Sequence, residues 1–146
     1  MPEPDYDERL AVPVYWWPIA AVCVVLLGAE VYAGFGWPVA IGTYAVLGGF
    51  ITALFLSWGA RVRVAGGALA AGRARLPVEA IGDVSALSAA SARKMRGDSR
   101  AFVFARPYLT YAVRVEVRDP DDPTPYWLVF TRRPESLAAA LARARA

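Results

Sequence analysis

The sequence contains no histidine, so it lacks the side chain that most often serves as general acid or base and as metal ligand. Histidine-based catalytic triads are thereby excluded. The only cysteine, Cys23, cannot form an internal disulfide, and its apolar surroundings give no information about the redox compartment. The glycine-rich stretch 66–72 lacks the Lys-Ser/Thr pair of a phosphate-binding loop, and no serine stands in a nucleophile-elbow motif. We therefore expect a protein that is not an enzyme, with no catalytic residue and no cofactor.

Charge is also scarce in the first part of the chain, where Arg9 is the only one of 16 lysines and arginines before Arg61. Two long apolar runs occupy this region, residues 14–33 with the single charge of Glu30 and residues 37–58 with none. Each has the roughly 20 residues that a helix needs to cross a bilayer, and aromatic residues stand at the ends of both. We predict a transmembrane helical hairpin over residues 13–59. A pair of buried helices in a soluble protein is the alternative.

The two predicted spans are joined by the short link Gly34–Gly36, which requires antiparallel neighbouring helices. Pro38 suits the first turn of the second helix, where its missing N–H costs nothing. Ala45, Gly49 and Ala53 recur at every fourth position and predict a face for close packing, with the first helix as the expected partner.

Positively charged residues predict the orientation. The link between the spans has no lysine or arginine, whereas four arginines follow the second span, at 61, 63, 73 and 75. By the positive-inside rule we expect a multi-pass protein of the plasma membrane with both termini cytoplasmic, residues 1–12 forming a cytoplasmic tail. The alternative is a cleaved signal peptide with a loose small-residue site at 31–33, which the acidic N-terminus and the second span disfavour.

Glu30 is the only carboxylate within a predicted span and is therefore a candidate intramembrane polar site. It lies one turn from the end of its helix, from where it can reach water or accept a hydrogen bond from Tyr44. A functional role for Glu30, with Tyr32 or Tyr44, would make the protein a small subunit of a membrane enzyme or transport complex.

From residue 60 the hydrophobic period changes to two, which indicates β-strands. We predict that residues 60–146 form a cytoplasmic domain of about six short strands. Gly66-Gly67 is expected to form a hairpin turn, Ser88 to cap a short helix, and Pro134 to open a C-terminal helix with Leu137 and Leu141 on its apolar face. The predicted class is an α+β membrane protein, whose small antiparallel sheet or barrel is covered by the C-terminal helix in a pleckstrin-homology-like architecture.

The acidic stretch 119–125 contains three aspartates, Asp119, Asp121 and Asp122, whose oxygens could chelate a divalent cation. The glycine and distal glutamate of a calcium-binding loop are absent, so we interpret the stretch as a polar hairpin connection and expect no metal site.

Several motifs stand in a fixed order along nearly the whole chain: "YWWP", two apolar runs, "RVRV", "GRARLPVEAIGDV", "RPYLTYAVRVEV" and "DPTPYWLVFTRRPESLAAAL". In this order the sequence resembles an actinobacterial family of two-span integral membrane proteins that is known as a domain of unknown function. The resemblance implies the topology, with a pleckstrin-homology-like cytoplasmic domain, and brings no catalytic residues.

Basic residues are the remaining candidates for contact with a partner or with lipid headgroups. They are Arg61, Arg63, Arg73, Arg75, Arg93, Lys94 and Arg96. A basic group near an anionic leaflet gains about 1 kcal/mol, although an ordinary solvated strand face is the simpler interpretation. Arg132 and Arg133, beside Tyr126 and Trp127, could meet an anion.

The predicted function is a non-enzymatic, membrane-anchored interaction or scaffold module. Its expected partners are the lipid bilayer and a membrane or cytoplasmic protein, and homo-oligomers are possible. With a net charge of +3 and no recognised motif, we expect no binding to nucleic acid.

Overall fold

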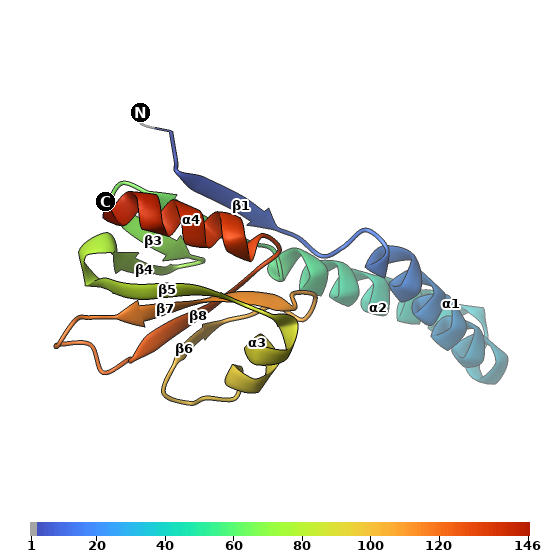
Figure 1. Cartoon of the computed structure of the whole chain (residues 1–146). Helices are drawn as coiled ribbons and strands as arrows, with labels where there is room; N and C mark the ends of the chain where they lie inside the picture. Colours follow the sequence, from blue (N-terminus) through green and yellow to red (C-terminus); the bar gives the residue numbers. More distant parts are fainter. Residues whose placement is uncertain (1–2) are drawn as a thin grey trace. The chain divides into compact units, whose positions relative to one another are not determined.

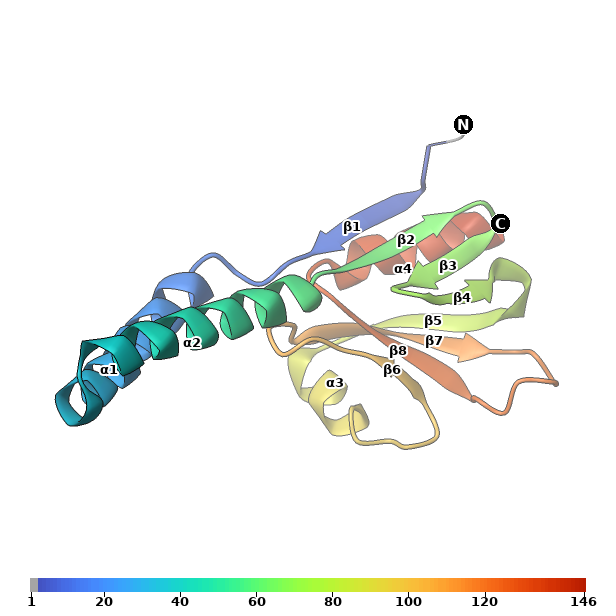
Figure 2. The same cartoon turned by 180° about the vertical axis from the view of Figure 1, so that it is seen from behind.

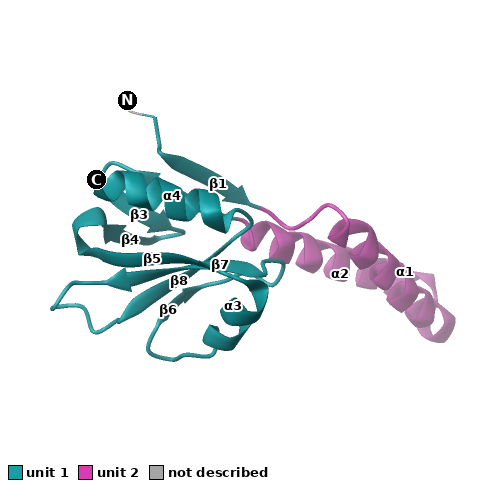
Figure 3. Ribbon diagram, in the orientation of Figure 1, with its two compact units in different colours: residues 1–10, 60–146 teal, residues 11–59 magenta. Residues whose placement is uncertain are grey.

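The computed structural model describes residues 3–146 and divides into two compact units. One unit combines the chain up to Leu10 with Ala60–Ala146, and the other is Ala11–Gly59 (Figure 3). The helical unit is therefore inserted between two segments of the other unit, and each is described by itself.

The helical unit contains helix α1 (Trp16–Phe35) and helix α2 (Trp37–Ser57), which pack against each other. Both are long and apolar enough to cross a membrane, as the sequence predicts. Only Gly36 separates them, and its φ of 82° lies in the region that favours glycine. Pro38 lies in the first turn of α2, also as predicted. Most of the large apolar side chains on both helices are exposed.

The interface between α1 and α2 is built on Gly28 and Tyr44. The Tyr44 ring lies over Gly28, where an added Cβ would come within 2.2 Å of the ring, and its hydroxyl donates a hydrogen bond of 3.2 Å to the Val25 carbonyl. The predicted packing face was wrong: Ala45, Gly49 and Ala53 are all exposed. Gly28 of α1 has no side chain and so permits the close approach, and α2 contributes the large ring of Tyr44.

Aromatic rings join the two helices at the end of the hairpin where the chain enters and leaves. The Phe55 ring centroid lies 5.1 Å from that of Trp17 and 6.2 Å from that of Trp16, both in edge-on geometry. Trp58 packs on Trp16 at 6.1 Å. Such pairs add stability beyond the area they bury, so this cluster holds the two helix ends together.

The second unit begins with sheet A, four antiparallel strands in the order β1-β2-β3-β4. They are β1 (Tyr6–Leu10), β2 (Ala60–Ala65), β3 (Ala68–Ala71) and β4 (Ala74–Pro77) (Figure 2). The Gly66-Gly67 turn joins β2 to β3 with positive φ at both glycines, as predicted.

Strand β1 was not predicted, because its residues were assigned to the cytoplasmic tail. Tyr6, Glu8 and Leu10 alternate with more exposed residues and are buried, so the segment has the period of a strand. The charge of Glu8 at an inward position conceals that period in the sequence. β1 pairs with β2 from Tyr6 opposite Val64 to Leu10 opposite Ala60. Residues on both sides of the helical hairpin therefore belong to one sheet.

Sheet B follows, with strands in the order β5-β7-β8-β6. Its strands are β5 (Ile81–Leu87), β6 (Phe102–Phe104), β7 (Tyr111–Val117) and β8 (Tyr126–Thr131). The single turn η1 (Val78–Ala80) precedes β5, and helix α3 (Ala89–Met95) lies between β5 and β6 in the chain. Ser88 caps α3 by accepting a hydrogen bond from the Ser91 N–H, as predicted. The all-antiparallel sheet was wrong in one respect: β6 pairs with β8 in parallel, because the chain crosses to the far edge after α3.

Helix α4 (Pro134–Arg145) packs against strands of both sheets and closes the core of this unit (Figure 1). Leu137, Ala140 and Leu141 are fully buried on its inner face, which confirms the predicted apolar stripe. All six residues of β8 are buried, so this strand is covered on both faces. Every buried residue of this core lies in β1 or after residue 60, so the unit has a hydrophobic core independent of the helical hairpin.

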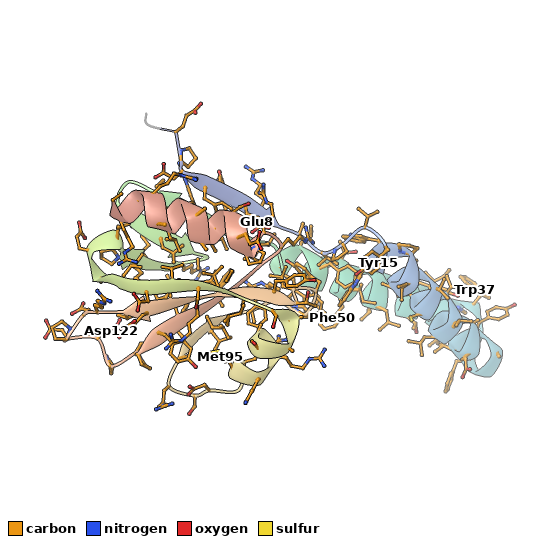
Figure 4. The ribbon with its side chains drawn as sticks, in the orientation of Figure 1. Glu8, Tyr15, Trp37, Phe50, Met95 and Asp122 are labelled. Atoms are coloured by element: carbon orange, nitrogen blue, oxygen red, sulfur yellow. The ribbon has the colours of Figure 1, made fainter. Side chains whose placement is uncertain are left out.

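A buried carboxylate fastens β1 to the end of β8 and the connection that leads to α4. Glu8 is 4% exposed, and one of its oxygens accepts hydrogen bonds from the Tyr6 hydroxyl, at 2.7 Å, and from the Thr131 hydroxyl. Its other oxygen accepts the Arg132 backbone N–H at 3.2 Å. Burial, above all, raises the pKa of Tyr6 to about 12, so its hydroxyl stays a donor at neutral pH. Figure 4 shows Glu8 between β1 and α4.

Replacing Gly28 by alanine is predicted to destabilise the helical hairpin by about 1–3 kcal/mol, because Tyr44 must move away and lose its hydrogen bond to Val25. The measurement is thermal unfolding of the full chain in detergent. Gly49→Ala is the matched control, since no atom lies within 4 Å of its added Cβ. Equal effects of the two substitutions would contradict the interface described here.

Replacing Glu8 by glutamine is predicted to lower the free energy of unfolding by about 1–3 kcal/mol, since an amide accepts hydrogen bonds at only one of the two positions, so that either the Arg132 N–H or the hydroxyls of Tyr6 and Thr131 lose their acceptor. Chemical denaturation of the full chain measures this, with the exposed Glu79→Gln as control. A Glu8→Gln protein as stable as the wild type would show that the carboxylate does not fasten β1.

Candidate functional site

The outward face of sheet A carries several of the predicted basic residues. In β2, Val62 and Val64 are buried while Arg61 and Arg63 are exposed, so both arginines point away from the core. Arg63 lies opposite Ala70 of β3, which lies opposite the exposed Arg75 of β4. The backbones of Arg63 and Arg75 are therefore two strand spacings, roughly 10 Å, apart, and Ala70 lies between them.

Two further arginines extend this face. Arg73 is exposed in the turn between β3 and β4. Arg9 of β1 lies directly opposite Arg61 and is also exposed, and it was not among the predicted contact residues. The alternation of Tyr6, Glu8 and Leu10 with polar residues was the signal that could have found it. We call Arg9, Arg61, Arg63, Arg73 and Arg75 the arginine face.

One carboxylate lies on the arginine face. The Arg61 guanidinium donates to both carboxylate oxygens of Asp7, with 2.6 Å between Nε and Oδ1. This hydrogen-bonded pair lowers the pKa of Asp7 and raises that of Arg61. Five arginines and one aspartate leave a net charge of +4, which makes the face a suitable surface for anions.

The structure separates the other predicted basic residues from the arginine face. Arg93, Lys94 and Arg96 are exposed on α3, which packs on β5 and β7. Figures 1 and 2 show α3 on the far side of sheet B from sheet A. The Arg96 guanidinium lies 5.4 Å from the centre of the buried Phe130 ring, so this arginine also has a packing role.

The other candidate positions do not converge on a site. Glu30 is exposed on α1, and the expected hydrogen bond from Tyr44 was wrong, since that hydroxyl donates to Val25. In the acidic connection, Asp119 accepts the Asp121 N–H and Asp122 accepts the Thr124 N–H, which are the contacts of a polar turn.

Arg132 and Arg133 do not lie beside Tyr126 and Trp127 as the sequence order indicates. Their guanidinium groups lie over other rings, Arg132 at 5.4 Å from the centre of Tyr108 and Arg133 at 5.5 Å from that of Tyr6. Neighbours along a strand point to opposite sides, and the chain turns after Thr131, so sequence proximity is no guide here.

Asp98 fixes the segment between α3 and β6 to strand β8. Its carboxylate accepts a 2.7 Å hydrogen bond from the Tyr126 hydroxyl and a 3.0 Å hydrogen bond from the Arg100 backbone N–H. These two hydrogen bonds, with a weaker contribution from the Arg100 side chain, lower the pKa of Asp98 to about 2. The segment that follows the basic helix α3 is thereby held in place.

Comparison with known proteins gives one family match, which covers most of the chain. A family model described as a protein of unknown function (DUF3093) matches residues 5–141, which include β1, both long helices and nearly all of α4. No curated protein and no solved structure matches the chain.

Titration of Asp98 provides a test of this contact. Its folded-state pKa of about 2 lies below the ordinary value of about 4, so the contact stabilises the fold above about pH 4 and the contribution is lost as the pH falls through about 2. Tyr126→Phe is expected to raise the pKa of Asp98, and the exposed Tyr111→Phe to leave it unchanged. Carboxyl-carbon NMR measures both; an Asp98 that titrates identically in all three proteins would rule out the hydrogen bond.

Proposed function

The chain belongs to the DUF3093 family of proteins of unknown function, and from this premise we propose that it is a non-enzymatic, membrane-anchored interaction module whose arginine face binds anionic lipid headgroups. α1 and α2 are the membrane anchor, and the unit formed by β1 and residues 60–146 works at the membrane surface. The pleckstrin-homology-like character of this unit stays a prediction.

The observation that carries the proposal is the pairing of β1 with β2. Leu10 and Ala60 are opposite each other in sheet A, and the whole helical hairpin lies between them in the sequence. If α1 and α2 cross the bilayer, α1 begins and α2 ends on the side where sheet A is. Arg9 is seven residues before α1 and Arg61 four residues after α2, so chain connectivity alone keeps both close to the membrane surface.

Positive charge supports the cytoplasmic side for this unit. Arg9 and Arg61 flank the spans, whereas Gly36, between the helices, is flanked by aromatic and apolar residues. The buried Glu8 also argues against the signal-peptide alternative. Cleavage near Ala33 would remove β1 and leave the Arg132 N–H and the Thr131 hydroxyl without their carboxylate.

Electrostatics supports a lipid ligand for the arginine face. Each basic residue close to an anionic leaflet contributes about 1 kcal/mol, and the arginine face, with four arginines on strands of sheet A and Arg73 in a turn, carries a net charge of +4. Tethering by two spans keeps the face at high local concentration, so weak contacts are sufficient. The same tether would favour docking of a membrane or cytoplasmic protein, which we retain as a second candidate partner.

Vesicle binding tests the proposal on a soluble variant in which Asn-Gly joins Leu10 directly to Ala60, replacing the helical hairpin with a two-residue turn between paired positions. The independent core supports folding of this variant, and cooperative thermal unfolding is the check. We expect it to bind vesicles that contain phosphatidylglycerol and not vesicles of phosphatidylcholine alone. Each arginine removed from Arg63 and Arg75 should weaken binding about fivefold.

Arg93→Ala with Lys94→Ala on α3 is the matched control, because it removes the same charge from a different surface. Binding must fall with the Arg63 and Arg75 substitutions and hardly change with the control pair. Equal losses would indicate attraction by net charge alone, and no preference for phosphatidylglycerol would refute a lipid-binding arginine face.

A role for Glu30 in a membrane enzyme or transport complex has less support. Its side chain is exposed on α1, and Tyr44, its expected partner, binds elsewhere.

A further inference from the structure

An open groove lies where strand β8 leads into helix α4, on residues distinct from the arginine face. Its volume is about 510 Å³, and Leu87, Tyr111, Arg132, Arg133, Glu135 and Ser136 are among its lining residues. This volume is within the range of small-molecule sites. We propose that the groove binds a phosphate group, carried by a small organic anion or by a lipid headgroup, with Arg132 and Arg133 as its main ligands.

The backbone that presents the two arginines is fixed from behind. The Arg132 N–H donates to the buried Glu8 carboxylate at 3.2 Å, and the Arg133 N–H donates to the Thr131 hydroxyl at 3.1 Å. Thr131 is fully buried and itself donates to Glu8. An arginine pair on a fixed backbone loses less freedom on binding an anion than a pair on a mobile loop.

Aromatic rings hold the guanidinium groups as well. Arg132 lies over Tyr108 and Arg133 over Tyr6, at 5.4 and 5.5 Å from the ring centres. Stacking of this kind uses the face of the guanidinium, whose N–H donors lie in its plane. A planar guanidinium donates to two oxygens of one anion at once, and a phosphate supplies several oxygens.

The first turn of α4 adds donors to the same groove. Pro134 has no N–H, and the residue before it, Arg133, caps the helix without a side-chain hydrogen bond, so no cap side chain accepts the N–H groups of Glu135 and Ser136. The partial positive charge of the helix end acts in the same direction. The hydroxyls of Ser136 and Tyr111 are further donors along the lining.

Glu135 is the one carboxylate among the lining residues of this groove, and its charge predicts the direction in which a substitution changes phosphate affinity. It balances part of the positive charge when the groove is empty and repels an anion that enters. Neutralising it by Glu135→Gln should therefore tighten phosphate binding, whereas removing either arginine should weaken it. A role of these residues in folding alone predicts no such opposite effects.

Isothermal titration calorimetry with inorganic phosphate tests the proposal on the full chain in maltoside micelles, which contain no phosphate. We expect saturable binding that weakens about tenfold with Arg132→Ala or Arg133→Ala. Arg143→Ala, on an exposed position at the other end of α4, is the matched control and should leave binding unchanged. Glu135→Gln should bind phosphate about two- to threefold more tightly.

Absence of saturable phosphate binding in the wild type, or an equal loss in Arg143→Ala, would overturn the proposal. Since Arg133 also stacks on Tyr6, an Arg133→Ala protein that fails to fold is replaced by Arg133→Lys, which keeps the charge and should bind more weakly than wild type. The Glu135→Gln result stands independently, and a Glu135→Gln protein with weaker binding would count against the site.

Repeating the titration in phosphatidylglycerol nanodiscs distinguishes the two sources of the phosphate. A groove that takes a lipid headgroup is already occupied there and binds no added phosphate, whereas a groove for a soluble anion binds it as in maltoside. The outcome is independent of the arginine face, because Arg63 and Arg75 substitutions are not expected to change the phosphate titration.

Discussion

The pairing of β1 with β2 is the constraint on which the rest of the structure depends. It joins residues from before and after the helical hairpin into one sheet, with Leu10 opposite Ala60 at the point where the chain leaves and returns. Backbone hydrogen bonds along five paired positions hold the two segments together, and Glu8 adds side-chain contacts to the end of β8 and to the Arg132 N–H. This pairing adds Arg9 to the arginine face, beside Arg61. The same strand also provides Tyr6, on which Arg133 stacks in the proposed phosphate groove.

The basic residues of the arginine face, of α3 and of the connection between β8 and α4 lie in three different chemical settings. The arginine face is exposed, with Ala70 between Arg63 and Arg75, which suits a broad anionic surface. The charges on α3 are spread over a short helix, and one of them covers an aromatic ring. Arg132 and Arg133 lie instead at a groove, held by a buried carboxylate and by rings, which suits a discrete anion. Net charge alone, at +3, conceals this division.

Much of this fold follows from the sequence, because its strongest signals are local. The two long apolar helices, the Gly66-Gly67 turn, the Ser88 cap and the buried face of α4 all depend on residues close together in the chain. The features that sequence reasoning missed are non-local. Strand β1 forms by pairing with β2, which follows the whole hairpin in the sequence. The parallel pairing of β6 with β8 results from a crossover of the chain. The helices pack at Gly28 and not at the predicted small-residue face, because the large ring of Tyr44 lies over Gly28.

The position of β1 in the chain has a consequence for how the protein is made. A growing chain releases β1 first, yet its partner strand emerges only after both long helices have been synthesised. Until then Glu8 has neither Thr131 nor the Arg132 N–H to receive it, because these come still later. The sheet can therefore be completed only after both helices and β2 have been synthesised. β1 can therefore take its place in the sheet only after elements that are synthesised later.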